Sequence, residues 1–171
     1  MTTALFYDPR HRAHTHPLAP ESAQRLDGLM DYLESSGEIR ALERPPVELM
    51  PWGIVAAVHT QSHIDAVKRL SREGKARISL DTYLTPMAAE VALLAASSAV
   101  CATSAVLEGK VENAFSVMRT PGHHALSTRA MGYCIFNNAA IAAAYARREH
   151  GLTRVMIVDI DAHHGNGTEE I

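Results

Sequence analysis

The sequence has little of what marks an extracellular or nucleic-acid-binding protein. Its 171 residues include only two cysteines, Cys101 and Cys134, whose positions predict neither a disulfide framework nor a paired-cysteine metal site. Reduced thiols are typical of a cytoplasmic protein, which we expect here. Aromatic residues make up only 5% of the chain, and the net charge of −3 gives no basic surface for nucleic acid or acidic lipid.

Signals for secretion or membrane insertion are also missing. Residues 1–12 contain no basic stretch followed by a long apolar run, which argues against a secretory signal. Residues 91–107 carry no charge, but the stretch is short and rich in alanine, serine and threonine. We therefore expect a buried core helix there and no contact with a membrane.

What the sequence does contain is enough apolar material for one globular domain. Hydrophobic residues make up 47% of the chain and charged residues 20%, which is ordinary for a folded protein of this length. Ten histidines are the unusual part of the composition. Because histidine titrates near neutral pH and binds metals, these residues are where chemistry is expected.

Hydrophobic spacing and turn residues predict an alternation of strands and helices. We expect strands over 3–7, 114–118 and 154–160, and helices over 20–37, after Pro51, over 60–74, 85–109 and 136–149. The last two strands are nearly continuous apolar runs and are expected to be buried. This pattern predicts an α/β fold of three layers, a parallel sheet with helices on both faces. A ligand site is expected beyond the carboxyl ends of the strands.

One polar cluster, Asp159, Asp161 and His163, follows the last predicted strand. If the chain stays extended, alternate residues share a face, and Asp161 and His163 can face one Zn²⁺ ion. Asp159 is one step deeper and suits an acceptor that orients a neighbouring imidazole. The alternative is an aspartate bonded to its own loop and a satisfied histidine. We favour the cation for the whole pattern, because buried carboxylates need a cation or hydrogen-bond donors.

A second cluster, His123 and His124, lies in a predicted loop over 119–131. Adjacent side chains diverge, so the pair suits proton transfer better than binding to one metal. Loop histidines bonded to the backbone are the alternative. Beyond Gly132, Tyr133 is either the wall of a pocket or a core aromatic residue.

Three blocks of the sequence resemble the signatures of the zinc-dependent histone deacetylase family. They read RTPGHHA (119–125), MGYCIFNNAAIAAAYA (131–146) and VMIVDIDAHHGNGT (155–168). The family also includes bacterial acetylpolyamine amidohydrolases and acetoin-utilisation proteins, and the FNN and HHGNGT versions resemble its class II and bacterial branch. The resemblance implies an arginase/deacetylase-like fold.

The resemblance also implies roles for individual residues. Asp161 and His163 match the first two zinc ligands. His124 matches the general base that acts on zinc-bound water, and His123 matches its neighbour, which the residue matching Asp159 orients. The family also holds a monovalent cation, such as K⁺, near the positions of Asp159, Asp161 and His163.

Matches outside the two histidine clusters concern the substrate. Gly132 and Tyr133 match the narrow channel for the acyl-lysine stem. Asp81 matches a loop carboxylate that grips the substrate backbone, and Arg25 matches an arginine near the cavity that receives acetate. For these last two, a turn aspartate and a helix-surface arginine are equally good interpretations. Asn166 stands where other members carry an aspartate behind the second histidine.

The implied activity is zinc-dependent amide hydrolysis, which removes acetyl from acetyl-lysine or from acetylated small amines such as polyamines. The family's third zinc ligand and its tyrosine electrophile come later in the chain, and nothing follows Ile171. We therefore expect residues 1–171 to be the N-terminal portion of a single deacetylase-like catalytic domain. The alternative is a catalytically incomplete fragment, or a non-enzymatic interaction or metal-binding module. An incomplete sheet edge is expected to favour homo-oligomers or other association.

Overall fold

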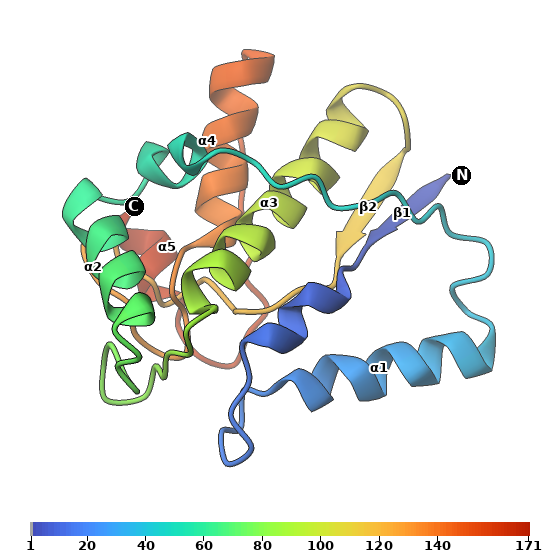
Figure 1. Cartoon of the computed structure of the whole chain (residues 1–171). Helices are drawn as coiled ribbons and strands as arrows, with labels where there is room; N and C mark the ends of the chain where they lie inside the picture. Colours follow the sequence, from blue (N-terminus) through green and yellow to red (C-terminus); the bar gives the residue numbers. More distant parts are fainter. Residues whose placement is uncertain (1) are drawn as a thin grey trace.

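The computed structural model describes residues 2–171, and its strands are separated by helices along the chain. In sequence order the elements are β1 (Thr3–Phe6), η1 (Pro9–Ala13), α1 (Ala23–Ser36), η2 (Trp52–Ala57), α2 (Gln61–Arg72), α3 (Ala88–Leu107), β2 (Asn113–Ser116), α4 (Asn138–His150) and α5 (Asn166–Glu170). The two strands pair in parallel, with Thr3 opposite Asn113 (Figure 1). The parallel sheet is therefore present.

Helices cover β1 on both of its faces, as predicted. Successive side chains of a strand point to opposite sides. Ala4 and Phe6 pack in one cluster with Leu94 of α3. Leu5 points the other way and packs with Leu26 of α1. The three layers of an arginase/deacetylase-like α/β fold are therefore formed by α1, the sheet and α3 (Figure 1).

The long apolar helix α3 lies at the centre of the core. Fourteen of its 20 residues are buried, and most of them are small, which lets α4 and α2 pack closely against it. Its length and composition would suffice to cross a membrane, but 67% of its apolar window is buried inside the fold. The prediction of a core helix at 91–107 is confirmed.

Several helices begin or end at the capping and glycine residues that predicted their ends. The side chain of Thr60 accepts a hydrogen bond from the backbone N–H of His63 and caps the start of α2. Gly37 and Gly151, with φ of +80° and +68°, end α1 and α4 in the left-handed conformation that glycine tolerates best. These ends depend on neighbours in sequence and could be read from it.

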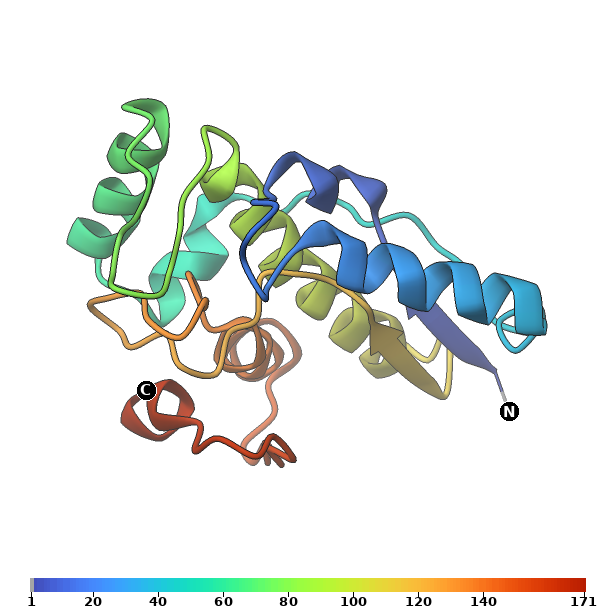
Figure 2. The same ribbon diagram turned by 90° about the horizontal axis from the view of Figure 1, so that it is seen from below.

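The strand predicted at 114–118 forms as β2, but the predicted burial of that strand and the strand predicted at 154–160 are wrong. β2 pairs only with β1 and its residues alternate between exposed and half-buried, with Phe115 64% exposed. Residues 154–160 form no strand, and Met156 and Ile160 are 84% and 94% exposed. A strand needs a neighbour for its hydrogen bonds, and within residues 2–171 none pairs with 154–160. In Figure 2 this orange-red segment joins α4 to α5 with no strand paired to it.

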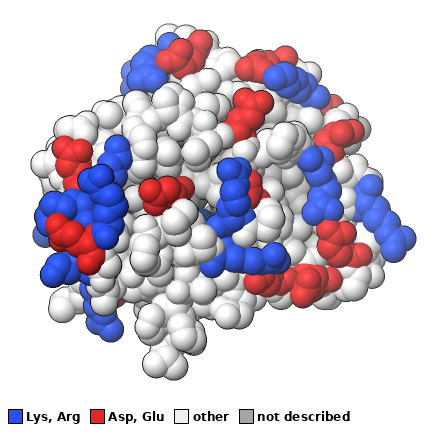
Figure 3. Space-filling model, viewed as in Figure 1, with Lys and Arg blue, Asp and Glu red and all other residues white. Residues whose placement is uncertain are grey.

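Charges of both signs are mixed over the molecular surface. On the face shown in Figure 3, lysine and arginine side chains lie among aspartates and glutamates rather than in one large area of a single sign. Mixed charge gives no long-range attraction for a polyanion on that face.

Candidate active site

The structure places His123 and His124 side by side, each with an acceptor of its own. His123 Nδ1 lies 2.9 Å from Asp159 Oδ2, and His124 Nδ1 lies 2.6 Å from Asn166 Oδ1. The two ring centroids are 4.0 Å apart. Because both partner oxygens accept, each Nδ1 carries the hydrogen, and Nε2 of a neutral ring is free to take a proton. This geometry suits proton transfer.

The histidine loop is held in place by the start of α5. The backbone carbonyl of His123 accepts hydrogen bonds from the backbone N–H groups of Gly167 and Thr168, at 2.9 and 3.1 Å. Any side chain at Gly167 would collide with the backbone of Ala125, so the two segments approach as only glycine allows. This contact sets Asn166 opposite the ring of His124.

The segment with the two aspartates is turned, not extended. Asp159 Oδ1 accepts from the backbone N–H of Asp161 at 3.1 Å, and Asp161 Oδ1 accepts from that of His163 at 2.8 Å. Each aspartate therefore makes a local turn, and the predicted persistence of the extended conformation is wrong. The carboxylates are also not buried, since their side chains are 34% and 48% exposed.

The same hydrogen bonds keep both carboxyl groups ionised. The backbone N–H of Asp161, followed by the ring of His123, lowers the pKa of Asp159 below its usual range. The backbone N–H and then the side chain of His163 lower the pKa of Asp161. Ionised oxygens are the form that binds a cation.

Asp161 and His163 fit part of a zinc site. His163 Nδ1 lies 3.0 Å from Asp161 Oδ1, and its ring meets that of His124 edge-on with centroids 6.0 Å apart. An oxygen and a nitrogen this close can bind one Zn²⁺ at the usual bond lengths of about 2.0–2.2 Å. Across residues 2–171, however, no three histidine, cysteine or acidic side chains converge on one point. The described chain thus offers two donors where a catalytic zinc site has three.

A tight turn presents Tyr133 next to the histidines. Met131 and Cys134 exchange two backbone hydrogen bonds, of 3.2 and 2.9 Å, around Gly132 and Tyr133. Both central residues have positive φ, +57° and +62°, as in a two-residue hairpin turn. That conformation is uncommon for tyrosine, and a hydrogen bond of 3.1 Å from its N–H to Thr82 Oγ1 supports it.

The side chain of Asp81 is hydrogen-bonded to this turn. Its Oδ1 accepts from the backbone N–H of Gly132 at 3.0 Å and from the hydroxyls of Ser79 and Thr82 at 2.9 and 3.1 Å. Burial alone would raise the pKa of Asp81, but these three hydrogen bonds outweigh it and the pKa is lowered. One oxygen is therefore committed to the chain itself, as in the turn interpretation, and the grip on a substrate stays a prediction.

In the Gly132→Ala variant, any reaction that uses His124 is expected to slow by about 100-fold or more while the chain stays folded, because a displacement of about 1 Å at a reacting group has that effect. A Cβ at this position would overlap the ring of His124, and the positive φ adds strain. Turnover and circular dichroism of the variant check this. Gly28→Ala is the control, because a Cβ there meets nothing within 4 Å. A folded Gly132→Ala protein with unchanged turnover would contradict the expectation.

A buried arginine that the sequence analysis did not single out lies at the base of the site. The guanidinium of Arg119 donates to both carboxylate oxygens of Glu21, at 2.6 and 2.7 Å, and to the hydroxyl of Tyr83 at 2.8 Å. The arginine and the glutamate are 1% and 4% exposed. Tyr83 directly follows Asp81 and Thr82, whose side chains accept hydrogen bonds from the turn at Gly132 and Tyr133. The available signal was a charged residue directly after the apolar run 114–118, at the first position of the histidine loop.

Arg25, the arginine for which the resemblance implies a role, is exposed on α1. Its proposed place near an acetate cavity stays a prediction.

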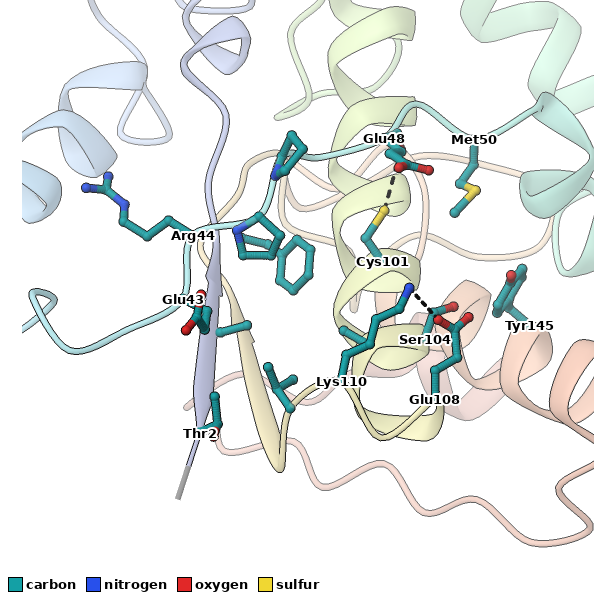
Figure 4. A pocket seen from close by; sticks show the side chains of 16 residues that line it. Thr2, Glu43, Arg44, Glu48, Met50, Cys101, Ser104, Glu108, Lys110 and Tyr145 are labelled. Carbon is teal, nitrogen blue, oxygen red and sulfur yellow. Dashed lines mark hydrogen bonds and ion pairs between the residues drawn. The ribbon is translucent and has the colours of Figure 1, made fainter.

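A cavity of about 610 Å³ lies apart from the histidines, between the segment 43–50, β1 and the C-terminal part of α3 (Figure 4). Cys101 and Tyr145 help to line it, and on one wall Lys110 Nζ lies 2.6 Å from Glu108 Oε2. None of the predicted site residues lines it. The cavity is therefore not part of the cluster around His123 and His124.

Fold and site together define an α/β domain of the arginase and deacetylase type. The family model described as "Histone deacetylase domain" matches residues 19–171. The chain belongs to the histone deacetylase family.

Individual relatives agree with this assignment. The chain is 37% identical over 156 residues to the "Histone deacetylase-like amidohydrolase" of Pseudomonas aeruginosa, covering 91% of this chain and 40% of that protein. It is 35% identical over 169 residues to a "Probable deacetylase" of Methanothermobacter thermautotrophicus, covering 98% and 49%. The crystal structure of the HDA15 HD domain superposes with a TM-score of 0.94 at 35% identity, over 100% of this chain and 50% of that one. The chain thus spans half or less of the length of these relatives.

Proposed function

We propose that the protein removes acetyl groups from acetyl-lysine or from acetylated small amines, such as polyamines, by hydrolysing the amide bond with the help of Zn²⁺. The observation that carries this proposal is the cluster of two hydrogen-bonded pairs, His123 with Asp159 and His124 with Asn166. The ring of His163, which pairs with Asp161, lies next to the ring of His124. The names of the relatives, which include deacetylases and an amidohydrolase, support it.

In this proposal each residue of the cluster has a definite task. Asp161 and His163 would hold the metal, which when bound would polarise the acetyl carbonyl and make a water molecule more acidic. His124 takes a proton from the attacking water at Nε2, because Asn166 keeps the hydrogen on Nδ1. The same nitrogen then gives the proton to the departing amine.

The remaining predicted residues position the reacting groups or bind the substrate. Asp159 orients the ring of His123, to which it is hydrogen-bonded, beside the ring of His124. Gly132 and Tyr133 form one wall of a channel for the acyl-lysine stem, where the phenol ring packs on the methylene groups. The carboxylates of Asp159 and Asp161 also suit the oxygen-rich environment that K⁺ requires, and a K⁺ site there is part of the proposal.

One observation favours a second candidate function, a metal-binding or interaction module without turnover. Residues 2–171 bring together only two donors, Asp161 and His163, and a two-donor site binds zinc weakly and leaves it without the geometry of catalytic sites.

An assay of the purified chain with an acetyl-lysine peptide and Zn²⁺ separates the two candidates. Zinc-dependent release of acetate that falls by about 10²–10⁴-fold in His124→Ala supports the enzyme, because that is the usual contribution of a general base. His164→Ala is the matched control, since this exposed ring contacts Glu169 at 2.7 Å and not the site. Stoichiometric zinc without turnover supports the module, and a folded chain that binds no zinc overturns both.

A further inference from the structure

His59 is a buried histidine that the proposed reaction does not use. It lies between η2 and α2 and is 3% exposed. Its ring centroid is 5.4 Å from those of His63 and Phe136. The titratable groups that face it are His63, on α2, and Glu170, on α5. Such a side chain either fills space in the core or performs a task through its two ring nitrogens.

Both nitrogens are in use, and their partners fix the state of the ring. Nδ1 lies 2.9 Å from the backbone carbonyl of Leu126, and Nε2 lies 2.9 Å from the backbone N–H of Asn137. A carbonyl can only accept and a backbone N–H can only donate. His59 must therefore be neutral, with its hydrogen on Nδ1 and a lone pair on Nε2.

The two partners are the ends of the segment that shapes the site. Leu126 comes two residues after His124, and Asn137 caps the start of α4. Between them lies the turn with Gly132 and Tyr133. One rigid ring thus closes the segment 126–137 into a loop at its base.

We propose that His59 is a positioning residue, whose neutral imidazole ties residues 126 and 137 together and so holds His124 and Tyr133 in place. The catalytic consequence rests on the function proposed above, whereas the structural tie does not.

Neighbouring contacts cannot replace this tie. The ring of His63 contacts this segment at one point, where Nε2 lies 2.9 Å from the carbonyl of Ile135. The backbone N–H of Thr60 reaches only Ser127, at 2.9 Å. A donor and an acceptor held on opposite sides of one ring are available only from histidine. Asparagine at position 59 could keep the donor and glutamine the acceptor, but neither keeps both.

The state of the ring can be measured in the wild-type chain by NMR of ¹⁵N-labelled histidines, with the His59 signals assigned from their loss in His59→Gln. At neutral pH we expect a protonated Nδ1 and an unprotonated Nε2 that stay in this single state. A ring with its hydrogen on Nε2, or one that averages the two forms, overturns the proposal without any variant having to fold.

Variants test whether the tie holds the site. His59→Gln and His59→Asn are each expected to speed amide hydrogen exchange across 126–137 by about tenfold, the effect of one lost hydrogen bond, without a change in α3. The imidazole signals of His124 should shift in both. The matched control is His63→Gln, because glutamine can still donate to Ile135, and it should leave exchange and the His124 signals unchanged. Equal effects at positions 59 and 63 would show a merely structural role and overturn the proposal.

Activity, where it is present, gives a third and separable readout. In His59→Gln, kcat is expected to fall about tenfold or more, because His124 is displaced, while His63→Gln keeps the wild-type rate. If the NMR and exchange results are as expected but no substrate is turned over, the proposed function fails and the tie stands. If deacetylation is found and both variants at position 59 keep wild-type rate and exchange, the tie fails alone.

Discussion

The Arg119→Met variant is expected to have a free energy of unfolding about 3–5 kcal/mol lower than the wild-type chain, the usual effect of breaking a buried ion pair. The guanidinium and the carboxylate of Glu21 are joined by two hydrogen bonds of 2.6 and 2.7 Å, and both residues are almost fully buried. Methionine keeps much of the volume, but it leaves the Glu21 carboxylate without a counter-charge in a site that water does not reach.

A second substitution separates the lost charge from lost packing. Adding Glu21→Gln to Arg119→Met removes the unpaired carboxylate, so the double variant should lose less stability than the sum of the single variants. Urea unfolding followed by the fluorescence of Trp52, the only tryptophan, measures each free energy. Arg148→Met, in an exposed pair with Glu149, should cost less than about 1 kcal/mol. Equal losses at positions 119 and 148 would contradict the expectation.

This buried pair matters for the site as well as for the fold. Arg119 also donates to the hydroxyl of Tyr83. Tyr83 directly follows Thr82, whose hydroxyl accepts from the N–H of Tyr133. The Arg119→Met protein, even where it stays folded, is therefore expected to hold the turn at Gly132 and Tyr133 less firmly.

The second large effect is a loss of stability in acid. Burial, together with Arg119, lowers the pKa of His14 to about 3, and burial, together with His63, lowers that of His59 to about 4. Burial also lowers the pKa values of His11 and His63. In the unfolded chain these groups titrate near their usual value of about 6.5.

The sign of the effect follows from which state binds protons. Between these folded and unfolded pKa values, the unfolded chain binds protons that the folded chain excludes. The stabilising contribution of each buried histidine is therefore complete above a pH of about 6.5 and is lost as the pH falls below it. In that range each histidine lowers the free energy of unfolding by up to about 1.4 kcal/mol per pH unit.

Urea unfolding at a series of pH values measures this dependence. His59→Gln should be less stable than wild type near neutral pH, but its further loss on acidification should be smaller, because one titrating group is gone. His164→Gln is the control, since the ring is exposed, and it should keep the wild-type slope. A free energy of unfolding that does not change between neutral pH and a pH of about 4.5 would contradict the assignment of buried neutral histidines.

Features that depend on nearby residues could be predicted from the sequence. The cap at Thr60 and the stops at Gly37 and Gly151 are hydrogen bonds and backbone angles within one turn of a helix. The predicted start of α1 near Pro20 was less accurate. The helix begins at Ala23, while Glu21 lies in the core against an arginine 98 residues away.

Features that depend on partners distant in the sequence could not be predicted from it. Apolar runs at 114–118 and 154–160 predicted two buried strands. Burial requires a neighbouring strand and a covering layer, and the described chain gives β2 one neighbour and the second run none. The sequence likewise indicated that His123 and His124 carry chemistry, but it did not contain the distances to their acceptors.

The sequence by itself determined the family, the parallel α/β layout and the two histidine-containing clusters of the site. The motifs indicate the family and the clusters, and the spacing of hydrophobic residues indicates the layout. Only the tertiary structure decided which side chains support the site. His59 and Arg119 are separated by many residues in the sequence from the partners they contact. The residues next to them in the sequence do not distinguish them from core histidines or surface arginines. Their roles arise where the folded chain leaves a buried hydrogen-bond donor, acceptor or charge that requires a partner.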